Sequence, residues 1–132
     1  MINRLTDALD FHSQALTLRA ERQRLIAGNI ANADTPGFQA RDFDFASALR
    51  AASGSAGVGE GIARDVMTTG GRVAPELRYA LPAQTNLDSN TVDMDRERAT
   101  FMENAFKYES TLRFINGNVR LMLDAMKSHN QA

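Results

Sequence analysis

The chain of 132 residues is 43% hydrophobic and 23% charged, which suits one domain of ordinary globular composition. Its net charge of -1 leaves no excess of basic residues to neutralise phosphates, so we expect no nucleic-acid partner. No apolar run approaches the roughly 18 residues of a membrane-spanning helix, and the first residues lack the features of a cleavable signal, so we expect no direct membrane insertion and no signal cleavage.

Residues 1–33 are predicted to form a long helix, because apolar residues recur along them at the helical period. One apolar face, which we expect to pack within the subunit, consists of Leu5, Leu9, Leu16, Ala20, Ala27 and Ile30. A second stripe lies nearly opposite and consists of Phe11, Leu18 and Leu25. A helix that is apolar on two sides must be covered on two sides, so this stripe predicts a further packing partner.

The first helix is predicted to stop at a run of short polar residues followed by Pro and Gly. The run consists of Asn29, Asn32, Asp34, Thr35, Pro36, Gly37 and Phe38. Short polar side chains compete with the helical backbone for hydrogen bonds, Pro36 forbids continuation, and Gly37 supplies a positive φ for a tight turn. Just after this turn, the alternation of Phe43 and Phe45 with acidic residues predicts an extended segment that docks its rings into a groove.

Residues 34–90 are predicted to form an irregular middle segment. Ala51–Gly61 is rich in small residues and low in complexity, so no regular element is expected there. Ile62–Met67 and Leu77–Leu81 have β-compatible compositions, with Gly70 and Gly71 as a turn between them. These features predict one short β-hairpin or none.

Residues 91–128 are predicted to form a second long helix that begins after Asp93, whose carboxylate suits the amino-terminal cap. An apolar seam at heptad spacing, which we expect to pack against the first helix, consists of Phe101, Ala105, Tyr108, Leu112, Ile115, Val119, Met122 and Met126. Phe106 and Phe114 project away from this seam. The fold class is therefore predicted to be mainly α, with the two terminal helices paired as an antiparallel coiled-coil-like hairpin.

No catalytic, cofactor or metal site is expected from the residue types. His12 and His129 have no plausible partner set, and the chain has no Cys for a nucleophile, a disulfide or a thiolate ligand. Asp93, Asp95 and Glu97 lack the central Gly and the distant closing Glu of a calcium loop, so they are interpreted as helix-capping residues. We therefore expect a protein that is not an enzyme.

The helix-stop run carries a resemblance to a known family. Residues 27–38, Ala-Gly-Asn-Ile-Ala-Asn-Ala-Asp-Thr-Pro-Gly-Phe, resemble the amino-terminal signature of the bacterial flagellar rod and hook axial proteins. Residues 40–45 and 90–98 are similar to the member of this family that builds the proximal rod. Gly28 and Ser89 depart from the pattern, since Ser or Ala is usual at the first position and Gly is common at the second.

This resemblance implies an exported structural subunit whose paired terminal helices stack in a helical tube across the periplasm. It implies copies of the chain and other rod proteins as partners, together with the membrane (MS) ring, its rod-adaptor protein and the flagellar type III export gate. In that setting we expect contacts between subunits at Phe11, Leu18, Leu25, Phe43, Phe45, Phe106 and Phe114. Residues 11–16 are similar to the short Phe-containing segment by which early substrates engage the export gate, and packing explains Phe11 equally well. The alternative is a soluble helical adaptor or export chaperone that holds a client on the same apolar faces.

Overall fold

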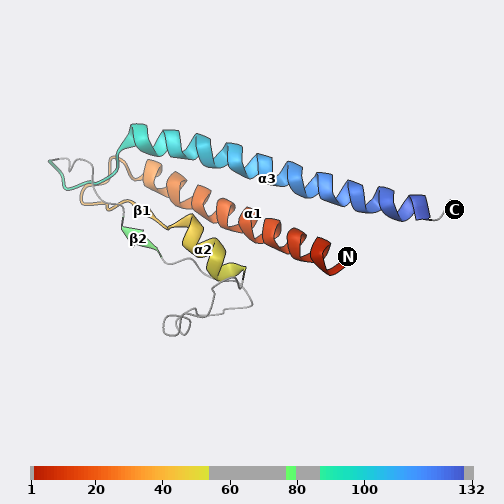
Figure 1. The fold of residues 1–132 in the computed structure, drawn as a ribbon. Helices are drawn as coiled ribbons and strands as arrows, with labels where there is room; N and C mark the ends of the chain where they lie inside the picture. The colour runs from red at the N-terminus through yellow and green to blue at the C-terminus, as the bar shows by residue number, and fades with distance from the viewer. Residues whose placement is uncertain (1, 54–76, 80–86, 130–132) are drawn as a thin grey trace, which may run out of the picture.

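The computed structural model describes residues 2–53, 77–79 and 87–129 (Figure 1). Its elements are α1 (Ile2–Ala31), β1 (Arg41–Asp42), α2 (Phe45–Ala52), β2 (Arg78–Tyr79) and α3 (Met94–His129). Two long helices dominate the described residues, which confirms the predicted mainly helical fold class.

The two long helices are antiparallel and lie side by side, as predicted (Figure 1). Two hydrogen bonds between them fix their register. Gln23 Nε2 donates to the Phe101 carbonyl at 3.5 Å, and Asn104 Nδ2 donates to the Arg19 carbonyl at 2.9 Å. Both chain ends therefore lie at the same end of the helix pair, where α3, with 36 residues against 30 in α1, extends past α1 (Figure 1).

Both predicted ends of the helix connection are confirmed. After α1 ends at Ala31, Gly37 has a φ of 71°, the left-handed conformation that favours glycine. At the start of α3, the Asp93 carboxylate accepts from the backbone N–H groups of Asp95 and Arg96, both at 3.2 Å. These bonds satisfy amide groups that have no partner within the helix.

Two of the three residues on the second apolar stripe of α1, Leu18 and Leu25, are covered by the chain itself. The β1–α2 segment packs on α1, while α3 packs against α1 and no other described element (Figure 1). Leu18, Phe43 and Ala48 form a buried cluster, and the partly buried residues around it are Leu25, Phe45, Leu49 and Ala52. Leu18 and Phe43, which were expected at contacts between subunits, are therefore buried within the chain, whereas Leu25 and Phe45 stay partly exposed.

The short helix α2, which the sequence reading missed, begins after a capping residue. The Asp44 carboxylate accepts from the Ala46 backbone N–H at 3.2 Å and from the Ser47 hydroxyl at 2.6 Å. The hydrogen bond from Ser47 holds the pKa of Asp44 below its usual range. An acidic cap followed by good helix formers was the available signal.

The two short strands pair differently from the predicted hairpin. β2 lies within the predicted Leu77–Leu81, but it pairs antiparallel with β1, with Arg41 opposite Tyr79. The predicted partner strand, Ile62–Met67, and the predicted turn at Gly70 and Gly71 lie outside the described residues.

Candidate functional site

The face of α3 that packs against α1 is a heptad line with alternating apolar and polar members. We call it the inner line: Met94, Glu97, Phe101, Asn104, Tyr108, Thr111, Ile115, Asn118 and Met122. Asn104 and Thr111 are its most buried members, at 2% and 8% exposure. The inner line contains half of the predicted seam, namely Phe101, Tyr108, Ile115 and Met122.

The other half of the predicted seam lies beside the inner line and is exposed. Ala105, Leu112, Val119 and Met126 belong to a second heptad line, the outer line of α3: Met102, Ala105, Glu109, Leu112, Asn116, Val119, Leu123 and Met126. All eight residues are exposed, and the five large apolar ones are between 39% and 73% exposed. The predicted seam is thus corrected at every second position.

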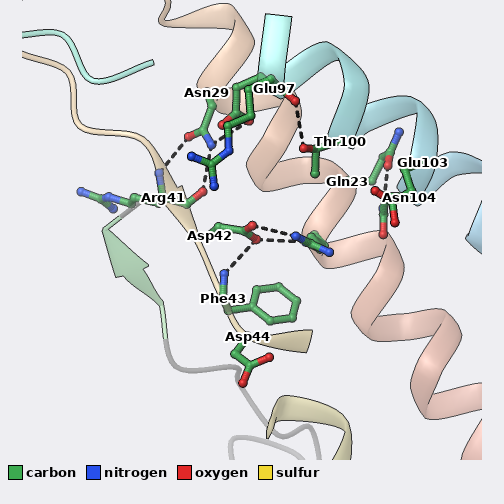
Figure 2. Close-up of polar contacts among 12 residues, drawn as sticks. Gln23, Asn29, Arg41, Asp42, Phe43, Asp44, Glu97, Thr100, Glu103 and Asn104 are labelled. Carbon is green, nitrogen blue, oxygen red and sulfur yellow. Dashed lines mark hydrogen bonds and ion pairs between the residues drawn. The ribbon is translucent and has the colours of Figure 1, made fainter. Parts of the chain in front are cut away.

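Polar partners on α1 explain why α3 buries Asn104 instead of its neighbour Ala105. Asn104 Nδ2 donates to Gln23 Oε1 at 2.6 Å as well as to the Arg19 carbonyl. These bonds offset the cost of burying the Asn104 amide N–H groups, whereas its Oδ1 is buried without a hydrogen-bond partner in the described part of the chain. The Gln23 side chain in turn donates to the Phe101 carbonyl, so the centre of the helix interface is a hydrogen-bonded group. Figure 2 shows Gln23 beside Asn104.

The free face of α1 is also a heptad line, but one of mostly small side chains. We call it the outer line of α1: Asp10, Ser13, Thr17, Ala20, Arg24, Ala27 and Ala31. All seven residues are exposed. Five of them are no larger than Thr, so another helix can approach this face closely.

The remaining predicted contact residues occupy several environments. Of the expected contacts between subunits, Phe11, Phe106 and Phe114 are exposed, although Phe114 stacks on the His12 ring at 6.1 Å between centroids. Of the expected packing face of α1, Leu9, Leu16 and Ile30 are half-buried, whereas Ala20 and Ala27 are exposed and lie on the outer line of α1. The side chain of Leu5 lies outside the described part of the chain.

Asn29 joins three segments at the end of the helix pair. Its Oδ1 accepts from the Arg41 backbone N–H at 3.0 Å, and its Nδ2 donates to the Arg41 carbonyl at 2.9 Å and to Glu97 Oε2 at 3.2 Å (Figure 2). Asn29 therefore pairs with β1 as a neighbouring strand would and also holds the start of α3. Burial raises the pKa of the Glu97 carboxyl, an effect reinforced by the nearby Asp42 and opposed by the hydrogen bond from Asn29.

A two-pronged ion pair holds β1 on α1. Arg22 Nε and Nη2 donate to the two Asp42 carboxylate oxygens at 3.1 and 2.9 Å (Figure 2). The hydrogen bonds to Asp42 raise the pKa of Arg22. One turn earlier, the Arg19 guanidinium lies 4.3 Å from the centroid of the Phe45 ring.

Asn90 connects the approach to α3 with the end of α1. It is fully buried, and its Nδ2 donates to the carbonyls of Asn32, Ala33 and Thr35 at 3.0, 2.8 and 2.8 Å. Its Oδ1 accepts from the Val92 backbone N–H at 2.8 Å. Asn90 thus supplies the cap for α1 from a segment more than fifty residues away.

The predicted helix-stop residues all lie in this connection. Asn32 Nδ2 donates to the Gly28 carbonyl at 2.8 Å, the Gly37 N–H donates to the Asp88 carbonyl at 2.8 Å, and the Phe38 carbonyl accepts from the Thr91 N–H at 3.1 Å. Thr35 also bonds to Asn32 through its hydroxyl, whereas Asp34 and Pro36 are exposed. The run therefore ends one helix and also binds the segment that begins the next.

Sequence reasoning missed the roles of Asn90, Asn104 and the Arg22–Asp42 pair. No local pattern marks them, because each acts on a partner at least twenty residues away. Among the described residues no group of His, Cys, Asp and Glu side chains is arranged to hold a metal ion. Neither long helix, within its described part, combines the length and apolarity that crossing a membrane requires.

Comparison with known proteins identifies relatives along nearly the whole chain. Residues 9–39 match the family model for the flagella basal body rod protein. The chain is 41% identical to the flagellar basal body rod protein FlgB of Escherichia coli K12, over 98% of this chain and 100% of that protein. It is 42% identical to FlgB of Proteus mirabilis HI4320, over 96% and 98%, and 40% identical to FlgB of Cereibacter sphaeroides, over 92% and 94%. The chain belongs to the FlgB family of flagellar basal body rod proteins.

Proposed function

We propose that this protein is a structural subunit of the proximal rod of the bacterial flagellar basal body and not an enzyme. The observation that carries the proposal is its identity of about 40% to FlgB proteins over nearly their whole length. In this role the subunit polymerises through helix packing, links the membrane ring to the distal rod and transmits torque. Its partners are further copies, other rod proteins, the MS ring and its rod-adaptor protein.

The arrangement of the chain supports a role in assembly. Residues 1–33 and 91–128 form the helical domain, and residues 34–90 form a middle segment that contributes to the connection. α3 packs against α1 alone among the described elements, which leaves the outer line of α3 and the exposed Phe11, Phe106 and Phe114 for contacts between subunits. A monomer rarely exposes so long an apolar strip without using it.

The same proposal places the mature protein in the periplasmic rod, reached through the flagellar type III export gate without a cleaved signal. Export through a narrow channel requires an unfolded chain. A helix pair whose interface contains Asn104, Thr111 and Asn118 is compatible with ready unfolding, because these residues replace apolar ones in the interface.

The test is electron microscopy of basal bodies from a strain that lacks this gene, with the same strain carrying a restored copy as the control. Rings without a rod, reversed by the restored gene, are the expected result. Intact rods in the deletion strain would contradict the proposal and favour the adaptor or export chaperone. An adaptor should purify as a stable small oligomer, whereas the free rod subunit should be a poorly stable monomer in thermal melts.

A further inference from the structure

Helix α3 buries its more polar face and exposes its more apolar one. Its inner line, packed on α1, includes Glu97, Asn104, Thr111 and Asn118. Six of the eight residues on its outer line are apolar, and the strip from Met102 to Met126 is about 36 Å long. Since apolar side chains gain most from burial, the outer line is the face whose exposure costs more. This inversion indicates that the outer line is covered in the assembled state.

The chain itself carries a face of complementary shape. On the outer line of α1, the small residues Ser13, Thr17, Ala20, Ala27 and Ala31 leave shallow holes at the same heptad spacing. Large side chains from one heptad line fit between small ones on another, as in coiled coils. Both lines are exposed in the chain's own fold, so they can meet only between two copies.

The charges on the two lines select a direction and a register. If the helices are antiparallel with Arg24 opposite Glu109, then Glu21 lies beside Arg113. On each helix the two charged residues already form an ion pair with each other. Arg24 pairs with Glu21 at 3.1 Å on α1, and Arg113 pairs with Glu109 at 2.6 Å on α3. Four alternating charges then form one network, which strengthens each pair.

The same register satisfies charges at the other end of the lines. Asp10 falls between Arg120 and Lys127, and none of these three side chains forms an ion pair with any residue that the structure describes. Within one chain, Gln23 lies against Phe101. Arg24 follows Gln23 directly, so placing it opposite Glu109 of the next copy requires that copy to be shifted along the helix axis. The shift is roughly nine residues, or about 13 Å.

Building on the proposed function, we propose that the outer line of α3 in one copy packs antiparallel on the outer line of α1 in the next copy, with Arg24 opposite Glu109. The partner is a second copy of this chain. A contact between two different faces leaves one of each face free at the two ends, so its repetition adds further copies and builds a ring or an open helical array.

Cysteine cross-linking tests this contact directly, because the chain has no native cysteine. Thr17→Cys and Asn116→Cys change exposed residues that lie opposite one another in the proposed register. Basal bodies would be isolated from cells that produce both single variants, one of them carrying a mass tag, and then oxidised. The expected main product is the mixed disulfide between positions 17 and 116, since a disulfide requires Cα atoms within roughly 7 Å.

The matched control pairs Thr17→Cys with Met102→Cys in place of Asn116→Cys. Met102 lies on the outer line of α3 as well, but about 21 Å from Asn116 along the helix. This pair should give no mixed product. A dominant product between two copies of position 116 would overturn the proposal in favour of an α3–α3 contact. Absence of any mixed product in strains that swim normally would overturn it as well.

Charge exchange supplies the second test. Arg24→Glu should lower the yield of the mixed product several-fold, and Glu109→Arg in the other copy should restore it; failure to restore would refute the register. The two proposals fail separately. Strains that swim without the mixed disulfide reject this contact and leave the rod function standing, whereas intact rods without the gene reject the rod function itself.

Discussion

Asn90 is predicted to hold the two long helices together, and Asn90→Ala tests this role. The substitution removes four hydrogen bonds from a fully buried position. The Asn32 and Thr35 carbonyls keep a second donor each, from the N–H groups of Thr35 and Phe38. The Ala33 carbonyl and the Val92 N–H lose the partner that the structure gives them.

The magnitude follows from these two groups. A buried donor or acceptor left without its partner costs about 1 to 3 kcal/mol. Two such groups lower the free energy of unfolding by about 2 to 6 kcal/mol, a large part of the roughly 5 to 15 kcal/mol that stabilises a typical domain.

Urea denaturation followed by circular dichroism measures this change on the purified chain at low concentration. The control is Asn116→Ala on the exposed outer line of α3, which should alter stability by less than about 0.5 kcal/mol. Asn90→Asp is a sharper variant. It keeps the acceptor for Val92 but turns a carboxylate toward three carbonyls, so it should be at least as unstable as Asn90→Ala at neutral pH and recover as acid protonates it.

An Asn90→Ala protein whose unfolding free energy lies within about 0.5 kcal/mol of the parent would refute the reasoning. It would mean that the helix pair is held by its interface alone and that the connection contributes little.

Three further predictions concern the connection and the α2 cluster. Ser89 has a φ of 61°, so Ser89→Gly should stabilise the chain by about 0.5 to 1 kcal/mol in thermal melts, and a lower melting temperature would contradict this. Burial raises the pKa of Glu97, so the folded chain holds this proton more tightly than the unfolded chain; the resulting stabilisation is present below the ordinary pKa of about 4.3 and is lost as pH rises through the raised pKa. The stability of the parent relative to Glu97→Gln should therefore fall as the pH rises above about 4 in a series of urea titrations, and a constant difference would argue against the burial effect. Phe43→Ala should cost about 3 to 5 kcal/mol and speed amide hydrogen exchange in α2, because Phe43 is the largest buried side chain of that cluster; unchanged protection of α2 would rule out this anchoring.

Local chemistry was enough to predict where α1 stops and where α3 begins. The Asp93 cap depends on a carboxylate reaching amides two and three residues along, and the stop before Gly37 depends on backbone sterics. The antiparallel pairing was likewise predictable, because each long helix carries an apolar stripe over its whole length and needs a partner. These features follow from residues close together in the chain.

The tertiary structure alone decided which stripe packs where. Heptad spacing is satisfied equally by Ala105 and by Asn104, and counting apolar residues favours Ala105. Asn104 is buried instead because Gln23 and the Arg19 carbonyl, some eighty residues earlier, satisfy its amide.

The same reasoning applies to Leu18 and Leu25, whose periodicity shows that they are covered but not by what. Their partner, the β1–α2 segment, is held by the Arg22–Asp42 ion pair and by Asn29, which are contacts between distant residues. The periodicity of apolar residues predicts that a helix face is buried. Hydrogen bonds and ion pairs between residues far apart in the chain determine which segment packs on that face.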